Sequence, residues 1–316
     1  RYLRNEEGLN QSQASHLYVA YNANGELGDA VTTSEAHGYG MLIVAMYGKR
    51  SDFDGLLRYA DYFRNARGLL GWQQRRDPYT GRLVPGIEGG ENSATDGDVD
   101  CAAALWMAAR RWSAECYAAR ARAWCDAILA HCVHPQRHTL LVGDWAHPRL
   151  TGAAAAATTT DASMLTRPSD YCLLYLTMFS SRHQERAMEW LQVVNATRRC
   201  INTQFHLHPQ TGLVADFLVW DVQQAMYMPA PGKVLESMHD GHFYWNACRV
   251  PWRLAHYYLH THDSAVEGHL RAFVRFLEAN CANGLVYAGY QLDGRPLVNY
   301  TDLAFLAPAA FCLWVM

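Results

Sequence analysis

The stretch TTSEAHGYGMLIVAMY, residues 32–47, decides the fold because it joins a helix start to an apolar continuation. Ser34 is a good N-cap residue, and the apolar run 41–46 predicts a buried helix over residues 35–48. The first turns also carry polar residues that a purely structural helix does not need: Glu35, His37 and Tyr39. Two glycines beside them would let a polymer or a neighbouring helix approach closely.

Helical periodicity dominates the rest of the chain. Further helices are expected over residues 53–68, 99–113, 115–132, 169–180, 184–203, 247–261, 264–280 and 301–315. Strand-like runs are short and scattered, and no βαβ alternation is found. The pattern predicts an all-α chain of about ten to twelve helices, in which antiparallel pairs can close into a ring with the long loops at one end.

Two long stretches interrupt this periodicity. Residues 134–166 are polar and alanine-rich and are expected to be irregular, and residues 206–245 contain prolines and glycines without a sustained period. Long structured loops of this kind are often functional.

The composition excludes several classes of partner. The chain has 316 residues, 50% of them hydrophobic, and a formal net charge of −3, which gives no electrostatic case for nucleic acid or an anionic membrane. No apolar run is long enough to span a bilayer. The nine cysteines match no zinc signature, and we interpret most of them as small buried apolar residues.

Two further stretches concentrate polar groups near a helix start. NSATDGDVDCA, residues 92–102, contains three aspartates, of which an N-cap explains only one. It lacks the downstream glycine and glutamate of an EF-hand, which disfavours a calcium loop. The other stretch is KVLESMHDGHFYWNACRVPWR, residues 233–253.

Several catalytic classes find no motif here. The sequence has no P-loop, no G-x-G-x-x-G and no G-x-S-x-G. His256 and His260 are i,i+4 partners without the glutamate of H-E-x-x-H, so we interpret them as packed or surface histidines. What remains is a set of separated carboxylates and many aromatic rings, as glycosidic bond cleavage requires. The acid that protonates the leaving oxygen has to stay protonated, and burial beside aromatic surface would allow this for Glu35.

At this point the sequence resembles the family-8 glycoside hydrolases, which include endoglucanases, lichenases, xylanases and chitosanases. SEAHGYGM and NSATDGDVDCAAAL carry the resemblance, and RPSDY (167–171) and NACRVPWRLA (246–255) extend it over nearly the whole chain. The resemblance implies an (α/α)6 barrel, a toroid of inner and outer helices, as a single catalytic domain over residues 1–316. It also implies hydrolysis of a β-linked polysaccharide with inversion at the anomeric carbon.

The resemblance also assigns roles to residues. Glu35 matches the proton donor, and Asp96 matches the carboxylate that grips the sugar in the −1 subsite. Weaker matches to substrate-binding positions are Trp72, Trp145, Tyr171 and Tyr39, and Asn246 is also expected to bind substrate. Arg249 is expected to orient the catalytic carboxylates or sugar hydroxyls.

One departure from the family pattern changes the expected base. Many members carry an aspartate where this chain has Asn246, and an amide cannot deprotonate water. The subgroup with asparagine resembles the chitosanase-glucanases and takes its base from a glutamate on an inserted loop. That glutamate is Glu236 here, with Asp240 as the reserve candidate, and its carboxyl is expected roughly 6.5–9.5 Å from that of Glu35.

The subgroup makes chitosan the first expected substrate, and acidic side chains along the groove would then attract its amines: Glu88, Glu91, Asp98, Asp240 and Asp293. The alternatives are an endo-β-1,4-glucanase or lichenase, and an inactive carbohydrate-binding protein on the same scaffold. A polysaccharide lyase or terpene cyclase lacks supporting motifs. We expect no metal or organic cofactor, a monomer, and a secreted location inferred from the substrate.

Overall fold

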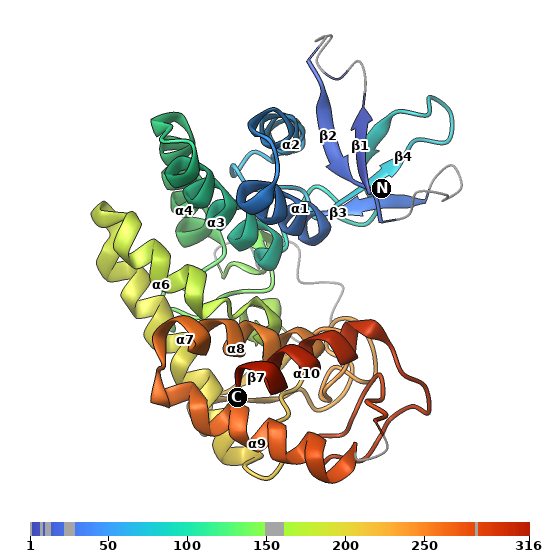
Figure 1. The fold of residues 1–316 in the computed structure, drawn as a ribbon, viewed down its shortest axis with the longest axis vertical. Helices are drawn as coiled ribbons and strands as arrows, with labels where there is room; N and C mark the ends of the chain where they lie inside the picture. The colour runs from blue at the N-terminus through green and yellow to red at the C-terminus, as the bar shows by residue number, and fades with distance from the viewer. Residues whose placement is uncertain (1, 7–8, 10–13, 22–28, 149–160, 282–283) are drawn as a thin grey trace. The chain divides into compact units, whose positions relative to one another are not determined.

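The computed structural model describes residues 2–6, 9, 14–21, 29–148, 161–281 and 284–316. The chain divides into two compact units (Figure 1). Unit 1 contains residues 1–133, 143–145 and 178–187, and unit 2 contains residues 134–142, 146–177 and 188–316. Each unit is described by itself.

Unit 1 combines helices with two small antiparallel sheets. Its helices are α1 (Ser34–Tyr47), α2 (Arg50–Tyr62), α3 (Thr95–Arg111) and α4 (Glu115–His131). Its strands are β1 (Leu3–Glu6), β2 (His16–Val19), β3 (Ala30–Thr33), β4 (Gln73–Arg76) and β5 (Leu83–Pro85). β1 pairs with β2, and the other sheet has the order β3-β4-β5. Phe53, Leu56 and Trp124 have no exposed surface and form part of the core between these elements.

Helices α1 and α3 lie side by side, and two glycines set their separation (Figure 1). A Cβ atom on Gly38 would lie 2.8 Å from the Cβ of Asp100, and one on Gly97 would lie 2.6 Å from the carbonyl carbon of Ser34. Real Cβ atoms do not approach other atoms so closely, so the two backbones meet only because both residues are glycine. The expected close approach of a neighbouring helix is therefore confirmed at Gly38.

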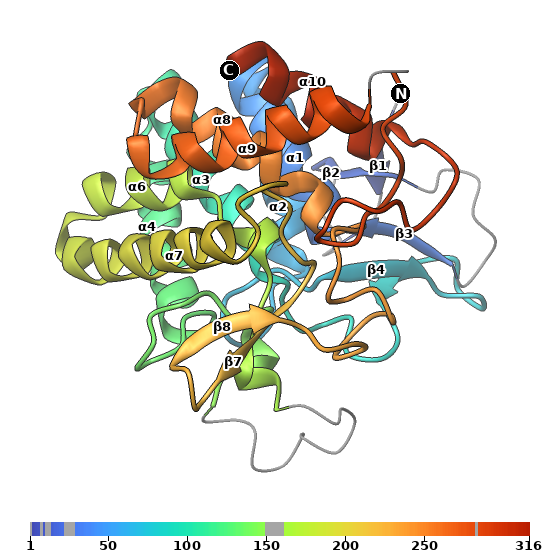
Figure 2. The same cartoon turned by 90° about the horizontal axis from the view of Figure 1, so that it is seen from below.

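Unit 2 contains most of the remaining helices. They are α7 (Ala187–Leu207), α8 (Val250–Thr261), α9 (Ser264–Asn280) and α10 (Leu303–Val315), while α6 (Leu173–Arg182) contributes residues to both units. A third antiparallel sheet has the order β6-β7-β8, with β6 (Leu165–Thr166), β7 (Leu218–Asp221) and β8 (Met226–Pro229) (Figure 2). α8 packs against α9 and α10 in this unit.

The expected helices are present, but several of their limits differ by three or four residues; α6, for example, begins at Leu173 rather than at residue 169. Three further differences concern α2, α3 and the segment 206–245. α2 ends at Tyr62 rather than at residue 68, because the Asn65 side chain accepts the backbone N–H groups of Arg67 and Leu69 and turns the chain. α3 begins four residues earlier than expected, at Thr95. The segment 206–245 contains the β7–β8 hairpin, which periodicity did not indicate.

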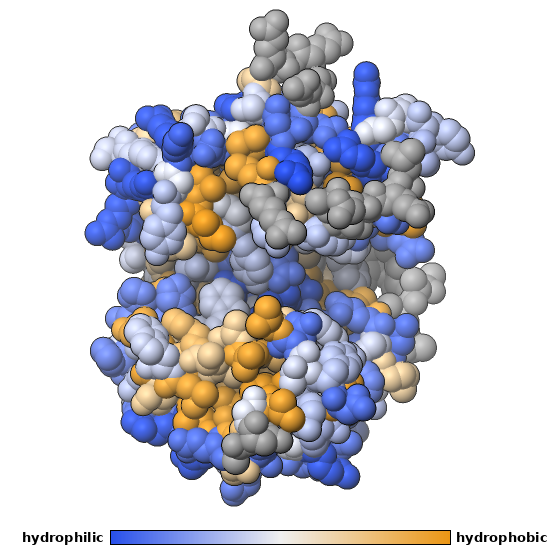
Figure 3. Space-filling view, turned by 45° about the vertical axis from the view of Figure 1, so that its right-hand side comes forward, coloured by the Kyte–Doolittle hydropathy of each residue, from blue (hydrophilic) through white to orange (hydrophobic). Residues whose placement is uncertain are grey.

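Unit 2 exposes a concentration of apolar side chains (Figure 3). On α10 these are Leu303, Leu306, Leu313 and Trp314. An open hollow of about 400 Å³ between α8 and α10 is lined by Trp252, His256, Ala307, Pro308 and Phe311. In the part of the chain that the structure describes, no helix is both long enough and apolar enough to cross a bilayer. The cysteines are mostly buried, as expected.

Candidate active site

Glu35 is the second residue of α1, and the structure explains how this helix starts. The N-cap is Thr33 rather than Ser34, because the Thr33 hydroxyl accepts the N–H of Ala36. Glu35 is half-buried, and its Oε1 accepts a hydrogen bond of 2.9 Å from the hydroxyl of Tyr39, one turn later. The acid and the ring that the sequence places at this helix start are therefore direct partners.

His37 packs the same helix against the core and does not belong to the polar face of that helix. Its ring is fully buried, lies 5.2 Å from the ring of Tyr59 in a stacked arrangement, and bonds the carbonyl oxygen of Leu56 through Nε2. Burial lowers the pKa of His37 to about 4, so the ring stays neutral at physiological pH.

Trp72 connects the start of α1 to the segment before α3. Its carbonyl oxygen accepts the N–H of Ser34 at 2.8 Å, and its own N–H donates to the carbonyl of Asn92 at 2.7 Å. The indole is half-buried. Since Ser34 precedes Glu35 and also contacts Gly97, the residue after Asp96, one backbone network holds the segments that carry both carboxylates.

The three aspartates of α3 are all buried but differ in their surroundings. Asp96 is 2% exposed, and its Oδ1 accepts the N–H of Gly97. Asp98 accepts hydrogen bonds from the backbone N–H of Leu70 and from Nε1 of Trp124. Burial raises the pKa of Asp98 to about 7 against the opposing effect of these bonds. Asp98 is therefore a structural carboxyl that ties α3 to α4 and to the end of the 63–70 turn.

Trp145 is held in unit 1 by its neighbour Asp144, which sequence reasoning missed. The buried Asp144 carboxylate accepts the N–H of Ser93 at 2.9 Å and Nδ2 of Asn65 at 2.8 Å, and pairs with Arg67 at 2.9 Å. These bonds fix the half-buried Trp145 beside the segment that leads into α3. No local sequence pattern predicts these contacts of Asp144, because Ser93 and Asp144 lie 51 residues apart.

In unit 2 the structure brings Glu236 and Asn246 together. Nδ2 of Asn246 donates to Oε2 of Glu236 at 2.8 Å, so the carboxylate of this exposed residue has a fixed partner. The Asn246 side chain is almost completely buried, and its Oδ1 accepts from Nη2 of Arg249 at 3.0 Å. The amide is thereby oriented with its donor toward the glutamate.

Arg249 extends this chain of hydrogen bonds to the RPSDY segment. Its Nη2 also donates to Oγ of the buried Ser169 at 2.9 Å. In the same segment, Nε of Arg167 donates to Oδ1 of Asp170 at 2.8 Å. Arg249 therefore reaches the loop glutamate through Asn246.

Tyr171 and Asp240 do not fit the roles expected for them. The Tyr171 ring is 2% exposed and its hydroxyl bonds Thr166, so it has no free face on which a sugar could stack. Asp240 is 1% exposed, and its two oxygens accept four backbone N–H groups, which leaves no accessible lone pair to act as a base. Both are structural residues.

Asp216 is a further buried carboxyl near Glu236 that the sequence did not indicate. Its Oδ1 accepts the N–H groups of Tyr244 at 2.9 Å and Ala247 at 2.7 Å. Burial raises the pKa of Asp216 to about 7, and the charge of Glu236 acts in the same direction. Asp216 thus supports the backbone on both sides of Asn246.

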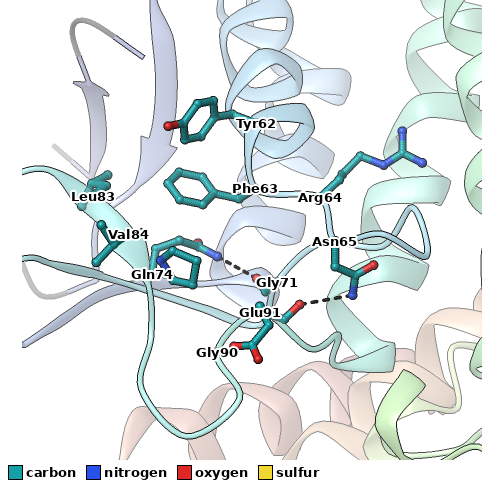
Figure 4. Close-up of a pocket in the computed structure, with 11 residues that line it drawn as sticks. Tyr62, Phe63, Arg64, Asn65, Gly71, Gln74, Leu83, Val84, Gly90 and Glu91 are labelled. Carbon is teal, nitrogen blue, oxygen red and sulfur yellow. Dashed lines mark hydrogen bonds between the residues drawn. The ribbon is translucent and has the colours of Figure 1, made fainter. Parts of the chain in front are cut away.

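A separate pocket of about 260 Å³ in unit 1 contains none of the predicted catalytic residues, although Glu91, one of the acidic residues expected along the groove, lines it (Figure 4). It lies between the end of α2, with Tyr62 and Phe63, and strands β4 and β5. Two of its amides are already engaged, Gln74 with the carbonyl of Gly71 and Asn65 with that of Glu91. The candidate site residues are therefore those of the carboxylate network within each unit, and not those of this pocket.

Comparison with known proteins identifies the family. The sequence pattern described as "Glycosyl hydrolases family 8" matches residues 23–307. The chain belongs to glycosyl hydrolase family 8. It is 34% identical over 313 residues to a β-glucanase of Niallia circulans, a match that covers 95% of this chain and 70% of the relative. It is also 26% identical to endoglucanase A of Acetivibrio thermocellus, of which it covers 52%.

A solved structure supports the same assignment. The β-1,3-1,4-glucanase of Paenibacillus sp. X4 is 31% identical and superposes with a TM-score of 0.82, over 98% of this chain and 77% of that one. This family-8 chain therefore has the all-α (α/α)6 barrel fold, and it is a glycoside hydrolase. Both expectations from the sequence are confirmed.

The substrate expectation needs correction. The relatives named above are glucanases and endoglucanases, which favours the alternative over chitosan. Two of the acidic residues expected to attract chitosan amines, Asp98 and Asp240, are buried and bonded internally, so they cannot line a groove. Glu88, Glu91 and Asp293 are exposed.

Proposed function

We propose that this family-8 enzyme is an endo-acting β-glucanase that hydrolyses mixed-linkage β-glucan with inversion. The proposed activity is that of its relatives, which are up to 34% identical to this chain and are named β-glucanase and endoglucanase. Since these polymers are extracellular, we also propose that the enzyme acts outside the cell.

In the proposed reaction, Glu35 is the general acid and Glu236 the general base. Glu35 gives its proton to the glycosidic oxygen as the C1–O bond breaks. Glu236 removes a proton from the water that attacks C1 from the opposite face. Asp96 binds the sugar in the −1 subsite, while Trp72, Trp145 and Tyr39, which also lie in unit 1, provide further substrate-binding surface.

The hydrogen bond from Asn246 to Glu236 is the observation that carries this proposal. A base must be ionised and must point consistently at its water. An amide donor at 2.8 Å fixes one oxygen of the carboxylate, while the other oxygen remains for water. The same contact argues against an inactive binding protein, which would have no need to orient this carboxylate.

The decisive experiment measures substrate range and product anomers together. The enzyme is incubated with mixed-linkage β-glucan, carboxymethyl-cellulose, chitosan and xylan, and the first products are followed by NMR. We expect the fastest turnover on mixed-linkage β-glucan, with α-anomers released first. Fastest turnover on chitosan, or β-anomers as first products, would contradict the proposal.

Substitution of the two carboxylates tests their roles. Glu35→Gln and Glu236→Gln are each expected to lower kcat by about 10³-fold or more while leaving folding and oligosaccharide binding intact, because only proton transfer is removed. Glu278→Gln, at an exposed position on α9, is the control and should retain full activity. If Glu236→Gln keeps most of its activity, the base lies elsewhere.

A further inference from the structure

Asp240 organises the loop that carries Glu236. Its Oδ2 accepts the consecutive backbone N–H groups of Val234, Leu235 and Glu236 at 2.8–3.0 Å, and its Oδ1 accepts that of Ser237 at 2.8 Å. Four N–H groups thus converge on one buried carboxylate, which offsets the cost of burying it.

This part of the loop has no regular secondary structure of its own. Residues 231–242 contain neither helix nor strand, so no ladder of backbone bonds fixes the path of the part that carries Glu236. The end of this segment is tied to the core by backbone bonds: the carbonyl oxygens of Asp240 and His242 accept the N–H groups of Phe217 and Asp216, each at 2.8 Å, and Phe243 forms a β-bridge with Tyr290. Phe217 is completely buried and provides a rigid anchor.

Glu236 is therefore fixed at two points. Its backbone N–H binds Asp240 at 3.0 Å, and its side-chain carboxylate binds Asn246 at 2.8 Å. The first contact sets where its Cα lies, and the second sets where the carboxylate points. Without the bond to Asp240, the backbone of Glu236 would be less well fixed and its carboxylate would be displaced from Asn246 part of the time. A displacement of about 1 Å at a catalytic group can lower the rate about 10²-fold.

We propose that Asp240 is a positioning residue for the general base, acting through the backbone of residues 234–237. This inference rests on the proposed role of Glu236. It goes beyond that role, because Asp240 neither contacts the attacking water nor exchanges a proton with it.

The primary test is Asp240→Asn, which keeps the size of the side chain but turns part of it into a donor that faces backbone N–H groups. We expect kcat on mixed-linkage β-glucan to fall about 10- to 100-fold, with KM changed less than about threefold, because the sugar-binding residues of unit 1 are untouched. Asp221→Asn is the matched control. Asp221 also accepts two backbone N–H groups, from Gln223 and Gln224, but in an exposed turn without a catalytic residue, and its variant should keep the parent kcat.

Azide provides a readout that a merely structural role would not move. Azide needs no deprotonation: its terminal nitrogen bonds to C1 as the C1–O bond breaks, and Glu35 protonates the leaving oxygen. Glu236→Ala should therefore regain turnover with azide and release a glycosyl azide of inverted configuration. Asp240→Asn should be rescued in the same way, since it too lacks a positioned base.

A double substitution completes the test. If Asp240 acts only through Glu236, adding Asp240→Asn to Glu236→Ala leaves the azide-rescued rate unchanged. A further drop of tenfold or more, or a parent-like kcat for Asp240→Asn alone, would overturn the inference. If Asp240→Asn does not fold, Asp240→Glu replaces it: it keeps the charge but moves the oxygens, and the same loss of kcat with azide rescue is expected.

A wrong assignment of Glu236 as the base would give a different set of results. Glu236→Ala would then retain most of its activity or show no azide product, whatever Asp240→Asn does. A catalytically dead Glu236→Ala that azide rescues, together with a fully active Asp240→Asn, would refute the positioning role alone.

Discussion

At the scale of single residues, Asn246 shows how an amide can serve a carboxylate. The sequence alone identifies Asn246 as a departure from the family pattern, because an amide cannot act as the base. The structure adds what this residue does instead: it receives a hydrogen bond from Arg249 and donates one to Glu236. An aspartate at this position would place two negative charges within hydrogen-bond distance.

This arrangement predicts the effect of Asn246→Asp. Two carboxyl groups so close together share a proton, so the base stays protonated until a higher pH. We expect kcat at neutral pH to fall at least about tenfold and the acid limb of the pH profile to move to higher pH. Asn280→Asp, at an exposed position at the end of α9, is the control. An unchanged acid limb in Asn246→Asp would contradict this account.

The same residues show how far a sequence can predict a site. Glu35, Asp96 and the Asn246 departure are recognisable because each lies in a short contiguous motif. Asp144 and Asp216 are not, because their partners are brought to them only by folding, across 51 residues in one case and 31 in the other. Tyr171 lies in a recognisable motif, but whether its ring faces solvent or core depends on packing that the motif does not specify.

At the scale of elements, the crossing of α1 and α3 depends on glycine at two positions. Gly38→Ala and Gly97→Ala should each lower the free energy of unfolding by about 1–3 kcal/mol, with the larger loss at Gly97, where the new methyl group meets backbone atoms of Ser34. Gly268→Ala in α9 is the matched comparison. Its Cβ would meet only the Phe205 ring at an ordinary 3.4 Å, so helix propensity should make this variant more stable by about 0.5–1 kcal/mol.

Denaturant unfolding of the three variants and the parent measures these differences. Equal effects of the same sign at all three positions would show that the helix crossing does not depend on the missing side chains.

Elements with strong local signals were predicted correctly, and those without them were missed. The expected limits of α9, residues 264–280, are confirmed, since Asp263 caps a clear apolar periodicity. The β7–β8 hairpin was missed because its turn lacks the usual glycine: Asp221 accepts two N–H groups, and Ala225 takes the left-handed conformation at φ 50°. A turn built from Asp221 to Ala225 resembles any other loop in sequence.

At the scale of the whole molecule, each unit contains a buried neutral histidine that makes stability depend on pH. Burial lowers the pKa of both His37 in unit 1 and His269 in unit 2 to about 4, against about 6.5 in the unfolded chain. The unfolded state therefore binds protons first as pH falls. The contribution of each histidine is fully present above about pH 6.5 and is lost progressively toward pH 4.

Replacing these histidines should reduce that dependence. Between pH 7 and pH 5, His37→Gln and His269→Gln should each lose on the order of 2 kcal/mol less unfolding free energy than the parent. Comparison with the parent is needed because Asp98, whose pKa is raised to about 7, has the opposite pH dependence. His206→Gln, at an exposed position, is the control and should follow the parent curve. A parent-like slope in both buried variants would exclude these histidines as the source.

The buried Asp240 carboxylate makes the path of the loop independent of the side chains on the outer surface of the loop. The path of the loop is set from inside, while the side chains of Lys233 and Met238 point outward and are exposed. Such a loop can exchange its outer residues during evolution, and so adapt to a different polymer, without disturbing proton abstraction. Enzymes with different substrate specificities but the same catalytic geometry could arise in this way. A library of variants randomised only at these two positions would test this.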